Sequence, residues 1–251
     1  MAHQSLKTRT MNIPANINKV LSKIEDTSNP ISIFVYGSRA NNEARENSDW
    51  EVGVLYEEDK KWSRSELAKI HDIENLNIYP FDIEKLKKYE IDTPFPTKIY
   101  IKDLVEGSET VIGKNVLEEL NSPDITAADL LETTSFETGY ALGALIALRD
   151  GAEIAASIMF SKSVFFGLRN LIIMEKGTYP SSFTEIYKQA DELNLEDKYK
   201  ELVKTAMKVR NGDYPSYQQI FTNISLQNQM IRKRILETYP DLKTIVIKGD
   251  N

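Results

Sequence analysis

The sequence predicts an α+β fold in which a mixed sheet flanked by helices is followed by a C-terminal helical bundle. Between Pro30 and Gly113, short runs of β-branched and aromatic residues alternate with polar turns, a pattern typical of strands. After Ser122 the apolar residues recur at helical spacing over long segments. We therefore expect two domains, residues 1–122 and residues 123–251.

The N-terminal half is expected to contain four strands and two helices. The strand candidates are the runs ISIFVYG (31–37), WEVGVLY (50–56), LNIYPF (76–81) and TKIYIKDL (97–104). A helix before the first strand is indicated by the spacing of Ile17, Val20, Leu21 and Ile24. A second helix is expected over 63–73, where Ser63 and Glu66 have the spacing of a capping box.

The C-terminal half is expected to be helical. Thr126 can cap a first helix that ends near Gly151, and a second helix should end before Gly177. Three further helices are expected over 182–193, 196–210 and 217–239. The tail after Pro240 is expected to form a short strand or a loose terminus.

Composition excludes several classes of function. The chain has 31 Lys and Arg against 38 Asp and Glu, a net charge of −7, and this argues against a large nucleic-acid interface, which needs clustered cations. Because there is no cysteine, thiol chemistry is excluded, and two histidines are too few for a His-rich metal site. Because no signal-peptide-like run and no uncharged stretch of membrane-spanning length is found, we expect a soluble, cytoplasmic protein without a membrane segment.

One segment, IFVYGSRANNEARENSDWEVGVLY (33–56), carries the chemistry. Its first predicted strand ends at Gly37 and Ser38, and the second opens on Asp49 and Glu51. Because side chains alternate along a strand, these two carboxylates point to one face, roughly 6–7 Å apart. Such a pair suits a hard divalent cation, usually magnesium where a triphosphate supplies further oxygens.

The residues around the turn suit the phosphates themselves. Gly37 lets a phosphate approach the backbone, and the amide groups from Ser38 onward are expected to open a helix whose positive end holds phosphate oxygens. Arg39 and Arg45 are candidates to neutralise further phosphate charge. Together these residues predict a nucleoside-triphosphate and magnesium site.

This run resembles the signature of the nucleotidyltransferases related to DNA polymerase beta, in which Gly-Ser is followed after some ten residues by Asp-x-Asp or Asp-x-Glu. The two-domain order and the helical second half are most similar to the antibiotic nucleotidyltransferases of the kanamycin type. The resemblance implies transfer of a nucleoside monophosphate, AMP from ATP, to a hydroxyl of a small molecule, with one or two magnesium ions and release of pyrophosphate. It also implies a homodimer as one form of the protein.

The resemblance leaves one metal ligand and the general base open. The family has a third carboxylate on a later strand, where this sequence has Asn77; Asp82 is nearby but falls on the opposite face of a regular strand. Either Asn77 departs from the family or the strand register differs. The stretch FETGYA (136–141) resembles the surroundings of the family's base, which implies that Glu137 accepts the proton of the acceptor hydroxyl. The family's lysine one turn later is Ala141 here, and the alternative for Glu137 is an ordinary surface glutamate.

Two functions follow from this pattern. The first is an adenylyltransferase acting on a small hydroxyl compound, and the net charge of −7 favours a cationic one such as an aminoglycoside. The second is a regulatory or antitoxin-like nucleotidyltransferase module that modifies or binds a protein or RNA partner, with catalysis impaired by the missing carboxylate.

Overall fold

The computed structural model describes residues 11–45, 48–57 and 60–249, which form two compact units. The first unit comprises the residues up to Ile91 together with Asp103–Leu120, and the second comprises Asp92–Lys102 and the residues from Asn121 onward. The two-domain interpretation placed residues 92–102 with the N-terminal part, whereas the structure groups them with the helices.

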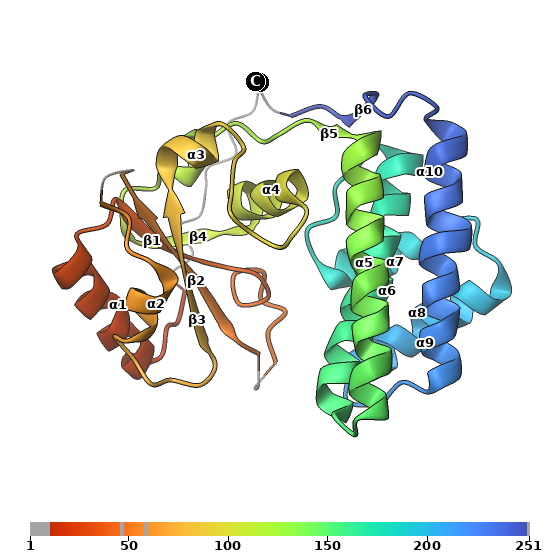
Figure 1. The fold of residues 1–251 in the computed structure, drawn as a ribbon, viewed down its shortest axis with the longest axis horizontal. Coiled ribbons are helices and arrows are strands. Elements are labelled where there is room, and N and C mark those ends of the chain that lie inside the picture. The colour runs from red at the N-terminus through yellow and green to blue at the C-terminus, as the bar shows by residue number, and fades with distance from the viewer. Residues whose placement is uncertain (1–10, 46–47, 58–59, 250–251) are drawn as a thin grey trace. The chain divides into compact units, whose positions relative to one another are not determined.

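The first unit is built on a four-stranded mixed sheet of order β3-β2-β1-β4 (Figure 1). Its strands are β1 (Ser32–Tyr36), β2 (Trp50–Tyr56), β3 (Leu76–Asp82) and β4 (Glu109–Gly113). β1 is antiparallel to both β2 and β4, and β2 is parallel to β3. The predicted α+β fold with a mixed sheet is confirmed.

The two faces of this sheet have different roles. One face packs against α1 (Ala15–Ser28) and α2 (Arg64–Ala68), and its core includes Val35, Trp50 and Val52. The opposite face carries an aromatic group made of Phe34, Tyr36, Tyr79 and Phe81. The Phe34 ring lies directly on Gly53, where a Cβ would collide with it. Because side chains alternate along each strand, the sheet has a helix-covered face, with Val35, Trp50 and Val52, and an aromatic face, with Phe34, Tyr36, Tyr79 and Phe81.

The predicted strand at 97–104 is wrong, because these residues form the helix α4 (Thr97–Gly107). Its β-branched residues favoured a strand, but the Tyr100 amide donates to the Pro96 carbonyl in the helical pattern, and Ile101 and Leu104 are buried three residues apart. The fourth strand is β4 instead. α2 ends at Ala68, earlier than predicted, and a short helix α3 (Ile83–Lys87) follows β3.

The helical unit follows its sequence signals closely. Its elements are β5 (Ile125–Thr126), α5 (Ala127–Arg149), α6 (Glu153–Lys176), α7 (Phe183–Ala190), α8 (Asp197–Arg210), α9 (Tyr217–Ser225), a π-helix (Leu226–Ile231), α10 (Arg232–Thr238) and β6 (Ile245–Ile247). The single helix expected over 217–239 is thus α9 and α10 joined through the π-helix. The tail forms a strand, β6, which pairs antiparallel with β5.

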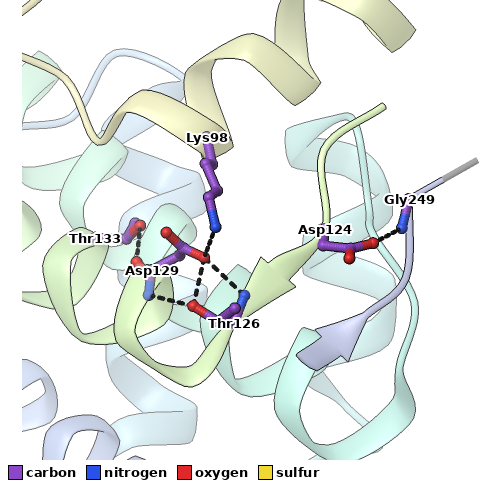
Figure 2. Close-up of polar contacts among 6 residues, drawn as sticks. All are labelled: Lys98, Asp124, Thr126, Asp129, Thr133 and Gly249. Atoms are coloured by element: carbon purple, nitrogen blue, oxygen red, sulfur yellow. Dashed lines mark hydrogen bonds and ion pairs between the residues drawn. The ribbon is translucent and has the colours of Figure 1, made fainter. Parts of the chain in front are cut away.

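Polar contacts fix the start of α5 (Figure 2). Thr126 and Asp129 form a capping box, as the Asp129 carboxylate also accepts from the Thr126 amide at 2.7 Å. The Lys98 ammonium lies 3.1 Å from the same carboxylate, which ties residues 92–102 to the helical unit. The Gly249 amide donates to Asp124 at 2.6 Å and holds the end of the described chain there.

α6 is the centre of the helical core. By length and composition this helix is apolar enough to cross a membrane, but 67% of its apolar window is buried inside the structure. Phe160, Val164 and Leu168 on it are fully buried. It is thus an interior helix of the bundle.

Candidate active site

The strand register brings the Gly-Ser turn and the acidic pair together. Tyr36, the last residue of β1, pairs with Glu51 on β2, and Gly37 follows directly. Gly37 has a left-handed φ of +72°, and a Cβ on it would collide with the Glu51 carboxylate. The carboxylate therefore rests against the glycine backbone, where a ligand phosphate held by Gly37 would also meet it.

Asp49 lies on the same side of the sheet as Glu51. It immediately precedes β2 and is exposed, whereas Glu51 is half-buried. Burial raises the pKa of Tyr79, the Arg64 guanidinium opposes this rise, and the charges of Glu51 and Asp49 add to it. Both carboxylates thus raise the pKa of one hydroxyl group, which agrees with their place on the aromatic face by strand alternation.

The register also decides which residue stands in the third carboxylate position. Glu51 pairs with Asn77 on β3, so an amide lies beside it. Asp82 pairs with Tyr56 at the far end of the strand, and its Oδ1 caps α3 by accepting from the amides of Glu84 and Lys85 at 2.8 and 3.1 Å. Asn77 is therefore a departure from the family pattern, and Asp82 has a structural role.

The donor set at this edge fits a hard cation. Two carboxylates and the neighbouring amide oxygen of Asn77 are oxygen donors of the kind that magnesium takes, with water and phosphate oxygens completing its shell. In the part of the chain that the structure describes, no cluster of three or more His, Cys, Asp or Glu side chains is placed to hold a metal. Magnesium binding by Asp49 and Glu51, with Asn77 next to them, stays a prediction.

The chain after Ser38 does not open the predicted helix. The Asn41 amide donates to the Gly37 carbonyl at 3.2 Å and the Glu43 amide to the Ser38 carbonyl at 2.9 Å, but residues 37–42 form only successive turns. Asn42 adopts a left-handed φ of 55°, which ends any helical run. Phosphate oxygens would therefore meet turn amides and not the end of a helix dipole.

The two arginines of the motif lie in different places. The Arg39 Nη2 donates to the Ser48 carbonyl at 2.5 Å, and its guanidinium lies 5.0 Å from the centroid of the Trp50 ring. Arg39 therefore connects the start of the loop between β1 and β2 to Ser48 at its end. Since Trp50 belongs to the helix-covered core, this contact lies on the helix-covered side of the sheet. Arg45 is exposed, and its amide donates to the Ser48 hydroxyl at 2.8 Å. A phosphate contact by either arginine stays a prediction.

Arg64 and Tyr79 are the residues that motif analysis missed at this face. Arg64 opens α2 and Tyr79 lies on β3, two positions after Asn77. Neither belongs to the segment 33–56. Only the alternation of β3 could have placed Tyr79 with Asn77, and no sequence signal links Arg64 to it.

Glu137 lies in the helical unit and is only 3% exposed, so the alternative of an ordinary surface glutamate is wrong. Burial raises its pKa well above the usual value, against the opposing effects of Arg169 and Lys162. Its carbonyl accepts from the Ser163 hydroxyl at 2.7 Å, while its Oε2 has no hydrogen-bond partner among the described residues. Its role as a base stays a prediction.

Comparison with known protein families decides the class. Residues 16–105, which include the whole motif and β1 to β3, match the family described as Polymerase beta, Nucleotidyltransferase. The chain carries a nucleotidyltransferase domain of the DNA polymerase beta superfamily. The predicted family and the prediction of a nucleotidyltransferase are confirmed. A search of curated protein sequences gives no match.

A solved structure shares the architecture of this nucleotidyltransferase. The spectinomycin adenyltransferase AAD(9) from Enterococcus faecialis, in a crystal structure with ATP and spectinomycin, aligns with a TM-score of 0.55 and 14% identity, over 87% of this chain and 96% of its own. A nucleotidyltransferase-like protein from Exiguobacterium sibiricum 255-15 aligns over 89% and 76%, with 12% identity and a TM-score of 0.33. At this identity the first comparison shows a common fold.

Gly37→Ala is expected to lower the activity of this nucleotidyltransferase about 10- to 100-fold, because the new Cβ must displace the Glu51 carboxylate. A steady-state transfer assay measures the loss. Gly151→Ala is the matched control, since Gly151 has a similar φ of +76° but nothing within 4 Å of its Cβ position. Both variants should lose about 1 kcal/mol from left-handed strain, and equal activity in the two would contradict the role of the Gly37–Glu51 contact.

Proposed function

We propose that the protein transfers AMP from ATP to a hydroxyl group of a small molecule and releases pyrophosphate. The observation that carries the proposal is the placement of the Glu51 carboxylate against Gly37, with Asp49 on the same face. The similar fold of an adenyltransferase crystallised with ATP and spectinomycin supports both the nucleotide and a small-molecule acceptor.

Each residue has a distinct proposed role. The backbone at Gly37 and Ser38 binds the β- and γ-phosphates, and Arg39 and Arg45 are further candidates for phosphate contacts. Asp49 and Glu51 would hold one or two magnesium ions. When bound there, magnesium supplies positive charge that offsets the charge moving onto the leaving pyrophosphate.

The proposed base is Glu137. The acceptor oxygen attacks the α-phosphorus, the bond from that phosphorus to the oxygen bridging to the β-phosphate breaks, and pyrophosphate leaves with the electron pair. The hydroxyl proton passes to the Glu137 carboxylate. A buried carboxylate whose pKa is raised is a stronger base than an exposed one, which suits this step.

The acceptor is proposed to be cationic. The net charge of −7 favours a polyamine-like compound such as an aminoglycoside over a polynucleotide. Use of ATP is consistent with a cytoplasmic protein. A homodimer stays a prediction.

One observation favours the second candidate function, a regulatory module with impaired catalysis that acts on a protein or RNA. Asn77 occupies the position beside Glu51 where the family resemblance implies a third carboxylate. An amide neither adds negative charge for the metal nor accepts a proton at neutral pH.

Incubation of the purified protein with α-labelled ATP, magnesium and a panel of aminoglycosides, spectinomycin and lincosamides tests the two candidates. We expect a labelled small-molecule adduct and stoichiometric pyrophosphate. Label on a protein or RNA in place of any small molecule would favour the regulatory function. Omission of magnesium is the control, and transfer that continues without a divalent ion would contradict the role given to the acidic pair.

A further inference from the structure

Arg64 is held on the aromatic face of the sheet by Tyr79. The Arg64 Cζ lies 4.4 Å from the centroid of the Tyr79 ring, and its Nη2 donates to the Tyr79 hydroxyl at 3.3 Å. Arg64 is exposed, while the ring beneath it is half-buried. The guanidinium is therefore stacked on a fixed platform, with N–H donors still open to solvent.

Tyr79 brings this guanidinium toward the acidic pair. It lies on the face of β3 that carries Asn77, the residue paired with Glu51. Its ring centroid is 6.3 Å from that of Tyr36, the residue just before Gly37. The Tyr79 hydroxyl also lies within the electrostatic reach of Arg64, Glu51 and Asp49 together. The contact between Arg64 and Tyr79 thus places one cation on the face of the sheet that carries the two carboxylates.

Of the two arginines in the motif, Arg39 lies on the other side of the sheet. Arg39 stacks on Trp50, and Trp50 points into the core under the helices, opposite to Asp49 and Glu51. α2 lies beside β3, which is the edge strand of the sheet (Figure 1). Because β3 is the edge strand, the long side chain of Arg64 at the start of α2 passes around that edge and contacts Tyr79 on the aromatic face.

We propose that Arg64 binds the triphosphate of the nucleotide beside Asp49 and Glu51, and that Tyr79 is the positioning residue that holds Arg64 there. This inference rests on the proposed function, since it assigns a further residue to the same nucleotide site. A triphosphate carries more negative charge than one magnesium ion offsets, and a planar guanidinium binds phosphate oxygens in pairs. Stacking on Tyr79 lowers the entropy that Arg64 loses when it binds.

The test is the affinity for α,β-methylene ATP, which cannot be cleaved at the α–β bond, measured with magnesium by isothermal titration calorimetry. Arg64→Met is expected to weaken binding 10- to 100-fold and to leave binding of AMP within about threefold of wild type, since a phosphate contact beyond the α-position is lost. Tyr79→Phe keeps the ring and should stay within about threefold of wild type. Tyr79→Ala removes the platform and should approach the loss seen for Arg64→Met, with no further loss in the double variant.

Lys19→Met is the matched control, because Lys19 is an exposed cation on α1, on the other side of the sheet. It removes the same charge and should leave the affinity unchanged. Thermal unfolding of each variant checks that the unit is folded. If Lys19→Met weakens binding as much as Arg64→Met, the effect is general electrostatics and the inference is wrong. The inference is also wrong if Arg64→Met binds α,β-methylene ATP as tightly as wild type does. It is wrong as well if Arg64→Met weakens the binding of AMP as much as that of the analogue. A wild-type protein that binds no nucleotide would overturn the proposed function itself.

Discussion

Asp49→Asn is expected to reduce nucleotidyl transfer by at least about 10³-fold, or about 4 kcal/mol of transition-state stabilisation. The substitution keeps the shape of the side chain and removes one of the two negative charges that would hold magnesium. Because Asp49 is exposed and precedes β2, the fold does not depend on its charge. The unfolding temperature should therefore stay within about 2 °C of wild type, as is usual for surface substitutions. Single-turnover transfer and thermal unfolding measure the two effects.

Asp82→Asn is the matched control for this prediction. It makes the same chemical change on an aspartate at the far end of the adjacent strand β3, whose Oδ1 caps α3. Since asparagine is also a good N-cap, both activity and stability should stay close to wild type. Loss of transfer in Asp82→Asn with survival in Asp49→Asn would show that the metal-binding carboxylates have been assigned to the wrong residues.

Local signals predicted the helical unit well and failed where a segment depends on its tertiary setting. Thr126 caps α5 through its own side chain, and α6 ends at Gly177 in a left-handed conformation, so both boundaries are determined within a few residues. Residues 97–104 have strand-like composition but are helical, because Pro96 begins a helical turn there and the buried positions follow helical spacing. Composition without periodicity was misleading at that segment.

The residues of the candidate site also fall into those that local sequence signals predicted and those that depend on tertiary contacts. Gly37, Asp49 and Glu51 lie in one short segment, so their spacing alone predicted that they belong together. The roles of Asn77 and Asp82 depended on the register of β3 against β2, which one sequence left open. Arg64 is placed near these residues by its contact with the ring of Tyr79 on the edge strand β3. No spacing of residues along the chain predicts such a contact.

Glu137→Gln is expected to make the protein more stable and less active at the same time. Because burial raises the pKa of Glu137 well above 4.5, the folded state keeps its proton at a pH where the unfolded state has lost it. The stability that this proton provides is complete below about pH 4.5 and is lost as the pH rises toward the raised pKa. Glutamine mimics the protonated form at every pH. The free energy of unfolding of Glu137→Gln relative to wild type should therefore rise by up to about 1.4 kcal/mol per pH unit over that window.

Urea unfolding between pH 5 and pH 8 measures this difference, and Glu132→Gln, an exposed substitution on the same helix, should show no such trend. If Glu137 is the base, the turnover of Glu137→Gln should fall about 10²- to 10⁴-fold, while the affinity for ATP changes little. A protein that has gained stability cannot owe this loss to unfolding, so the two measurements together separate a catalytic carboxylate from a structural one. Full turnover in the stabilised variant would assign Glu137 to the core of the helical unit and would require another residue to accept the hydroxyl proton.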